Sequence, residues 1–130
     1  MKKKFFSKII AKDNLGLQMI SACCSEAKVK VGEIKYLSKN KIFLLFLERF
    51  NKEANKNNTK INSFLRFEYI DNVKSKNINQ NNENLVLELV AIDFLKNIKN
   101  YEINLIFLNK ACITLFAEIV EATLEDQNND

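Results

Sequence analysis

The sequence predicts a β-rich α+β domain: a curved antiparallel sheet of about six strands, one helix near the N-terminus and a short C-terminal helix. Two patterns lead to this fold class. Apolar residues recur with helical spacing in one early segment, and later they alternate in short runs separated by polar turns. The chain has 130 residues, of which 47% are hydrophobic and 28% charged, as is usual for one globular domain. We expect that domain to span 5–126, with frayed ends at 1–4 and 127–130.

The helix follows Asp13, whose carboxylate is a good N-cap. Beyond it, apolar residues recur every three or four positions and predict one buried face, made by Leu17, Ile20, Cys24 and Ala27. Met19 and Cys23 are expected to widen that face. The adjacent cysteines are therefore interpreted as small core residues, since reactive thiols need an exposed, electropositive setting.

Alternation begins after the helix, but its parity changes. Val29 and Val31 have one parity, Ile34 and Tyr36 have the other, and Gly32 lies between them, which predicts a β-bulge or bend at the glycine. A turn at 38–41 then leads into 42–47. Both parities of this segment are apolar, so it predicts a central strand covered on both faces or at a subunit contact.

The remaining elements alternate between polar loops and strands. Loops are expected at 51–62 and 77–84, with strands in 63–73, 85–94, 101–108 and 112–118. In the first of these strands Leu65, Phe67 and Tyr69 are expected on one face. Asn109 and Lys110 form a tight turn, and Val120 and Leu124 have the spacing of a final helical turn.

Several functional classes are disfavoured by composition. The net charge of +4 comes almost entirely from lysines scattered among 16 acidic residues, whereas nucleic-acid readers use arginine and clustered charge. Polar residues interrupt the N-terminal apolar run, so neither a signal peptide nor a membrane span is expected, and a cytoplasmic location follows. With no histidine and no Cys-x-x-Cys pair, no metal site, cofactor or catalytic residue is predicted.

An ordered set of motifs resembles a known family. The motifs "ISA", "VGEIKYL", "LERF", "LRFE", "LVAIDF" and "EIVEATLED" match, in order and spacing, the domain-of-unknown-function family numbered 2948 of small bacterial proteins. The resemblance runs from about Asp13 to Asp126. The sequence departs from it at Gly16, where an acidic residue is usual, and at Asn109 and Lys110, where a glycine-rich turn is usual. The resemblance implies no activity, cofactor or catalytic residue.

Two sheet arrangements fit these elements, a split barrel of the pleckstrin-homology type and an open curled sheet crossed by the helix. Either arrangement would cover both faces of residues 42–47. A homodimer is another way to cover them.

Arg49 and Arg66 are the candidate site residues, because lysine supplies every other positive side chain. An arginine fork either locks a carboxylate, such as Glu68, Asp71 or Asp126, or binds an anion. The first interpretation makes both residues structural, and the second makes them a shared anion-binding patch.

Three functional classes follow from the sequence. The first is a non-enzymatic binding or adaptor module that recognises a protein or a small anion. The second is a protein attracted to nucleic acid or anionic lipid, through Lys2, Lys3 and Lys4 with Phe5 and Phe6. An enzyme is the least supported class.

Overall fold

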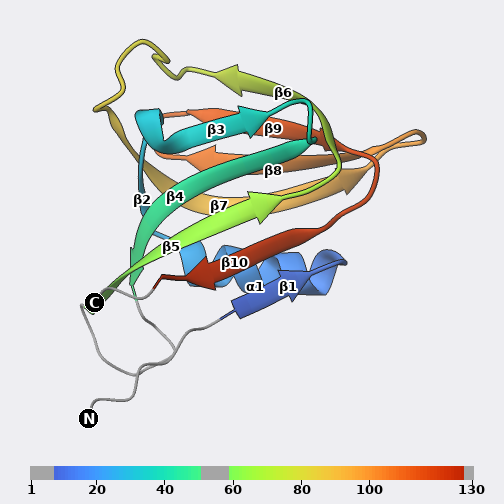
Figure 1. Cartoon of the computed structure of the whole chain (residues 1–130), viewed down its shortest axis with the longest axis horizontal. Helices are drawn as coiled ribbons and strands as arrows, with labels where there is room; N and C mark the ends of the chain where they lie inside the picture. Colours follow the sequence, from blue (N-terminus) through green and yellow to red (C-terminus); the bar gives the residue numbers. More distant parts are fainter. Residues whose placement is uncertain (1–7, 51–58, 128–130) are drawn as a thin grey trace.

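A computed structural model describes residues 8–50 and 59–127. This part of the chain forms ten strands and one α-helix (Figure 1). The elements, in chain order, are β1 (Lys8–Ala11), α1 (Asn14–Cys24), β2 (Lys28–Lys30), the 3-10 turn η1 (Val31–Glu33), β3 (Ile34–Leu37), β4 (Ile42–Phe50), β5 (Lys60–Phe67), β6 (Ile70–Lys76), β7 (Val86–Lys96), β8 (Tyr101–Phe107), β9 (Cys112–Ala117) and β10 (Ala122–Asp126). The predicted β-rich α+β class is confirmed, but the strand number was underestimated.

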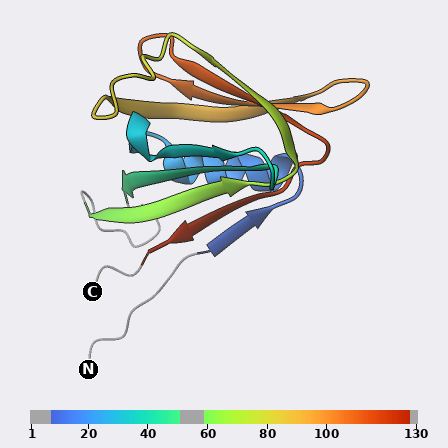
Figure 2. The same ribbon diagram turned by 45° about the horizontal axis from the view of Figure 1, so that its top comes forward.

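The strands form one antiparallel sheet folded into two facing layers (Figure 2). Strands β1, β10, β5, β4 and β3 make layer A, and β7, β8, β9 and β6 make layer B. The short strand β2 joins the layers by pairing with β4 and β7. The sheet does not close, because β3 pairs with β4 alone and β6 with β9 alone among the described strands. Buried side chains of both layers and of α1 form a single core.

Helix α1 begins as predicted. The Asp13 carboxylate accepts a hydrogen bond from the Gly16 amide at 2.8 Å, which satisfies one of the open donors of the first turn. Leu17, Ile20 and Cys24 are buried, which confirms the inward face. Met19 is 53% exposed, so its assignment to that face was wrong: it lies on the opposite side of the helix.

The helix also covers part of one strand edge. Strand β2 pairs only with the first residues of β7, so the next part of β7, which pairs with β8 on its other side, has no strand on this edge. There the Ser21 hydroxyl accepts a hydrogen bond from the Ile92 amide at 2.9 Å. Close approach on the other side of α1 depends on Gly16, because a Cβ there would lie 3.0 Å from Ala11. This short distance explains why residue 16 is glycine and not a residue with a larger side chain.

The parity change around Gly32 is real, but its cause is not a β-bulge. The 3-10 turn η1 separates β2 from β3, and a single helical turn re-aims the side chains as an inserted residue would. The Gly32 amide donates to the Glu83 carbonyl at 3.0 Å. A Cβ on Gly32 would lie 3.0 Å from the Glu83 Cβ, so glycine permits this close approach.

Strand β4 is central, as predicted, and its two faces differ in burial. Phe43, Leu45 and Leu47 point into the core, whereas the alternate residues on the outer face are half-buried. One of these, Phe46, packs on Phe64 of β5 with ring centroids 6.2 Å apart. Neighbouring outer side chains thus supply part of the second cover, and the homodimer stays a prediction.

The predicted C-terminal helix is wrong. Residues Ala122–Asp126 form strand β10, which pairs with β1 on one side and β5 on the other. Ala122, Leu124 and Asp126 alternate inward, and two flanking strands supply backbone partners that an isolated helical turn would lack. The spacing of Val120 and Leu124 was coincidental.

The predicted face of Tyr69 and the predicted end of the polar insert both need correction. Tyr69 does not share a face with Leu65 and Phe67: it has a φ of 62° and lies 40% exposed in the break between β5 and β6. The polar insert ends earlier than expected, because β5 already begins at Lys60. The loop prediction for 51–58, and the predictions for 1–7 and 128–130, lie outside the described residues. The backbone amide of Gln127 donates a hydrogen bond to the Asn62 carbonyl at 2.8 Å, so the pairing with β5 extends one residue beyond β10.

The tight turn between β8 and β9 is confirmed, with Asn109 and Lys110 both at a φ of 64°. Lysine is strained there, because a Cβ clashes with the backbone in the left-handed region. We therefore expect the Lys110→Gly variant to raise the free energy of unfolding by about 1 kcal/mol. Chemical denaturation measures this change. A Lys99→Gly variant in the other hairpin turn of layer B, where the φ is not positive, should give no such gain.

The burial of Cys24 predicts how its thiol reacts. Cys24 is 0% exposed, whereas Cys23 and Cys112 are partly buried. In a variant that keeps Cys24 alone, a thiol reagent should label the native protein slowly and the unfolded protein quickly. Fast labelling of that variant in the native state would contradict the position of α1 in the core.

Candidate functional site

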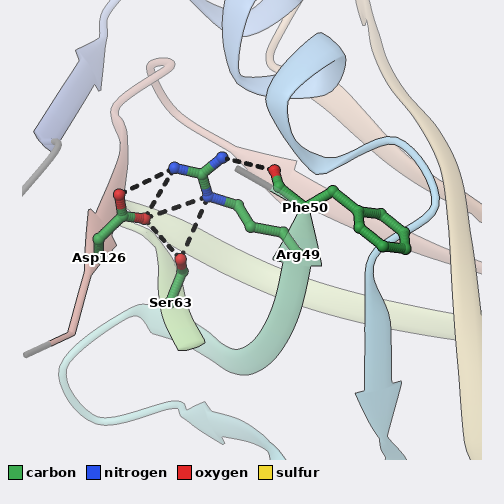
Figure 3. A network of polar contacts seen from close by, with 4 residues as sticks. All are labelled: Arg49, Phe50, Ser63 and Asp126. Atoms are coloured by element: carbon green, nitrogen blue, oxygen red, sulfur yellow. Dashed lines mark hydrogen bonds and ion pairs between the residues drawn. The ribbon is translucent and has the colours of Figure 1, made fainter. Parts of the chain in front are cut away.

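Arg49 lies in a buried polar network at one end of layer A (Figure 3). Its side chain is inaccessible to solvent, and Nη2 donates to both Asp126 carboxylate oxygens at 2.9 Å. Nε donates to Asp126 Oδ1 at 3.1 Å and to Ser63 Oγ at 3.2 Å. Nη1 donates to the Phe50 carbonyl at 3.2 Å. The network therefore joins the ends of β4, β5 and β10.

The chemistry of this network is structural. The Ser63 hydroxyl donates to Asp126 Oδ1 at 2.6 Å while it accepts from Arg49, so neither its proton nor its lone pair faces solvent. A serine nucleophile needs a base that takes its proton, and here the neighbouring carboxylate is neutralised by the guanidinium. The arginine fork is occupied by a carboxylate of the chain itself, as in the first of the two sequence interpretations.

Arg66 lies elsewhere, and the structure does not bring the two arginines together. Strands β4 and β5 are neighbours, but Arg49 pairs with Ile61 and Arg66 with Leu44, about 17 Å away along the strands. Arg49 points inward, and Arg66 points to the outer face of layer A. The nearest carboxylate to Arg66, that of Glu68, is 3.6 Å from Nη2. A patch made by both arginines is therefore ruled out by the register.

The two arginines should respond differently to the same substitution. The Arg49→Lys variant keeps the charge but loses the fork, so the free energy of unfolding should fall by about 1.5–3 kcal/mol. The Arg66→Lys variant should stay within about 0.5 kcal/mol of wild type. Its side chain is 41% exposed, and its buried Nε has no hydrogen-bond partner to lose. Equal losses in chemical denaturation would contradict this assignment.

A cavity with no charged residue in its lining lies between the layers, where strands β3 and β6 diverge. We call it the wedge cavity; its volume is about 380 Å³. Its walls come from both layers and the loop after β6, and they comprise Val31, Ile34, Tyr36, Phe43, Val73, Ser75, Ile78, Gln80 and Ile113. Most of these side chains belong to the core or pack against it. The cavity is thus an opening into the core along the unpaired edge of the sheet.

Beside Tyr36, which lines the wedge, hydrogen bonds join β3, β6 and the turn between β3 and β4. The Tyr36 hydroxyl donates to the Ile70 carbonyl at 3.0 Å, and the Ile70 amide donates to the Lys41 carbonyl at 2.9 Å. Lys41 Nζ lies 2.9 Å from Asp71 and 3.3 Å from Glu118. These contacts fix the start of β6 to the turn between β3 and β4.

The same contacts set the protonation of Lys41. Hydrogen bonds with Asp71 and then Glu118 raise the pKa of Lys41 above its ordinary value of 10.5. Since the charged form is favoured in the fold, its contribution is complete below pH 10.5 and is lost as pH rises through the raised pKa. At neutral pH Lys41 is therefore charged and can keep its ion pairs with Asp71 and Glu118.

We call the exposed part of the wedge lining, where Ser75 and Gln80 lie, the mouth. Ser75 and Gln80 are both exposed, and Gln80 Nε2 donates to Ser75 Oγ at 2.6 Å. This bond leaves the Ser75 hydroxyl proton as a donor and the Gln80 side-chain oxygen as an acceptor. The mouth can therefore offer one donor and one acceptor to a molecule inside the wedge.

Sequence reasoning missed this site because its residues come from five separate segments. One local signal was present: Ile78 is an isolated apolar residue in a loop of asparagine and glutamine, and it packs against the core. The unpaired edges of β3 and β6 carry no sequence signature. Only their arrangement in space makes the wedge.

Within 8–50 and 59–127, no group of three thiol or carboxylate side chains is placed to hold a metal ion. Across the same ranges, α1 falls short of the length needed to cross a bilayer.

These features define a class: a small domain made of one open antiparallel sheet in two layers, with a helix on one edge and an uncharged cavity on another. The chain belongs to the family described as "Protein of unknown function (DUF2948)", which matches residues 7–130. The resemblance inferred from the ordered motifs is thereby confirmed. Neither the curated proteins nor the solved structures that were compared with the chain gave a match.

Proposed function

We propose that this protein is a non-enzymatic binding module, and that its ligand occupies the wedge cavity. The observation that carries the proposal is an opening of about 380 Å³ that reaches core side chains through the gap between β3 and β6. Ligand sites are usually concave and mainly apolar, with a few polar groups that orient the ligand. Most side chains that line the wedge are aliphatic or aromatic, and polar atoms, which cover as much of the open lining as apolar atoms do, would orient the ligand.

The polar networks of the described residues support binding over catalysis. Arg49, Ser63 and Asp126 satisfy one another, and Lys41 is engaged by two carboxylates. General acid or base work needs a titratable group that can reach a substrate. The wedge lining contains serine, glutamine and tyrosine as its polar side chains and no carboxylate, thiol or amine.

The test uses 1-octanol as a probe. We expect saturable binding, followed by NMR of the methyl groups that line the wedge, and at least tenfold weaker binding in the Val73→Phe variant, whose ring fills the cavity. The matched control is Val90→Phe, at a 42% exposed valine of β7 that does not line the wedge. Equal affinity of both variants and wild type would exclude the wedge as the site.

The two alternatives carry less support. An anion site would need an available arginine fork: that of Arg49 is bound to Asp126, and that of Arg66 lies 3.6 Å from the carboxylate of Glu68. A surface for nucleic acid or anionic lipid would rest on Lys2, Lys3 and Lys4, which lie outside the described residues. The cytoplasmic location and the adaptor role are expectations that accompany the proposed binding function.

A further inference from the structure

We infer that the ligand of the wedge cavity is an uncharged molecule with an apolar body and one hydrogen-bonding end, such as a medium-chain alcohol or primary amide. This inference rests on the proposed function and names its ligand class. Three properties of the wedge lead to it: the absence of charge in its lining, its volume, and the placement of Ser75 and Gln80 at the mouth.

The lining excludes ions on energetic grounds. A carboxylate or ammonium moved from water into apolar surroundings loses several kcal/mol of hydration unless a counter-charge replaces it. None of the residues that line the wedge is charged. Lys41, in the turn that is bonded to β6 near Tyr36, is already paired with Asp71 and Glu118.

This lack of charge is not typical of the surface. The other described cavities of comparable size are each lined by charged side chains, such as Lys28 and Glu48 in one, Glu88 in the second, and Lys96 and Glu121 in the third. Since 28% of the residues are charged, an uncharged lining of nine residues is a distinctive property of the wedge.

Volume and polarity describe the rest of the ligand. At roughly 30 Å³ per non-hydrogen atom, a cavity of about 380 Å³ accepts on the order of ten such atoms. Six of the nine lining side chains are hydrocarbons that share the open lining with polar atoms, and the ligand body packs on these six and is therefore apolar. Ser75 and Gln80 at the mouth offer a donor and an acceptor, which match a hydroxyl or an amide at the outer end.

A matched series of eight-carbon probes tests the charge requirement. We expect 1-octanol to bind the full-length protein at least tenfold more tightly than octanoate or octylammonium at neutral pH, measured by methyl NMR titration. Binding of either ion as tight as that of the alcohol would overturn the inference. If all three bind the wedge equally, the proposed function stands and the ligand class is wrong.

Xenon tests the apolar part of the wedge separately from the hydrogen-bonding groups at its mouth, because it fills apolar cavities without accepting or donating a hydrogen bond. In the Ser75→Val variant, 1-octanol affinity should fall at least threefold while the xenon-induced methyl shifts stay unchanged. The matched control, Ser38→Val, lies in the exposed turn after β3 and should change neither. Unchanged octanol affinity in Ser75→Val would overturn the role of the mouth. If neither xenon nor any eight-carbon probe shifts the wedge methyl groups, the proposed function fails as well.

Discussion

The Asp126→Asn variant should lose about 3–5 kcal/mol of the free energy of unfolding, one of the two largest effects we expect. Asparagine has nearly the same shape, so packing is preserved and only the negative charge is removed. Arg49 would then remain inaccessible to solvent without its counter-ion, although its other contacts persist. Denaturant unfolding followed by circular dichroism measures the loss.

The neighbouring residue provides the control. Glu125 lies on the same strand, and its carboxylate is 3.9 Å from Lys8 in a solvent-exposed pair. The Glu125→Gln variant should therefore change stability by less than about 1 kcal/mol. Removing both buried charges, in an Arg49→Met and Asp126→Asn double variant, should recover part of the loss. A loss below about 1 kcal/mol in Asp126→Asn alone would contradict the buried ion pair.

The Phe67→Ala variant is expected to be equally damaging, at about 3–5 kcal/mol. Phe67 is fully buried in β5, where it pairs with Phe43 of β4 and Ala122 of β10. Its removal leaves a cavity that strands on both sides cannot easily fill. The same denaturation experiment measures it.

Phe64 makes a matched comparison on the same strand. It has the opposite parity, lies half-buried on the outer face and packs on Phe46. The Phe64→Ala variant should lose clearly less stability than Phe67→Ala, because less area is removed from the interior. Equal losses would indicate that the outer face of layer A is covered as fully as the inner face, as it would be in a homodimer.

Local patterns predicted the local structure well. Asp13 and the spacing after it gave the position of α1, and Asn109 with Lys110 marked a turn that needs positive φ values. Both features depend on neighbours within a few residues. The same local rule failed at Val120 and Leu124, because Leu124 belongs to a strand whose partners come from distant segments and Val120 precedes that strand.

The site was predicted only in part. Arg49 was identified because arginine is rare in this chain, and Asp126 was among the suggested partners. The different role of Arg66 follows from its parity on β5, which places it on the other face. The wedge could not be predicted, because it depends on which strand edges remain unpaired after the sheet folds over.

The most direct test of the proposed function is a methyl NMR titration of the full-length protein with 1-octanol. We predict saturable shifts at the methyl groups of Val31, Ile34, Val73, Ile78 and Ile113, which surround the wedge. Ile103, buried in β8 and absent from the lining, should not respond. Shifts that are absent, that do not saturate, or that centre on residues outside the wedge would contradict the assignment of this cavity as the binding site.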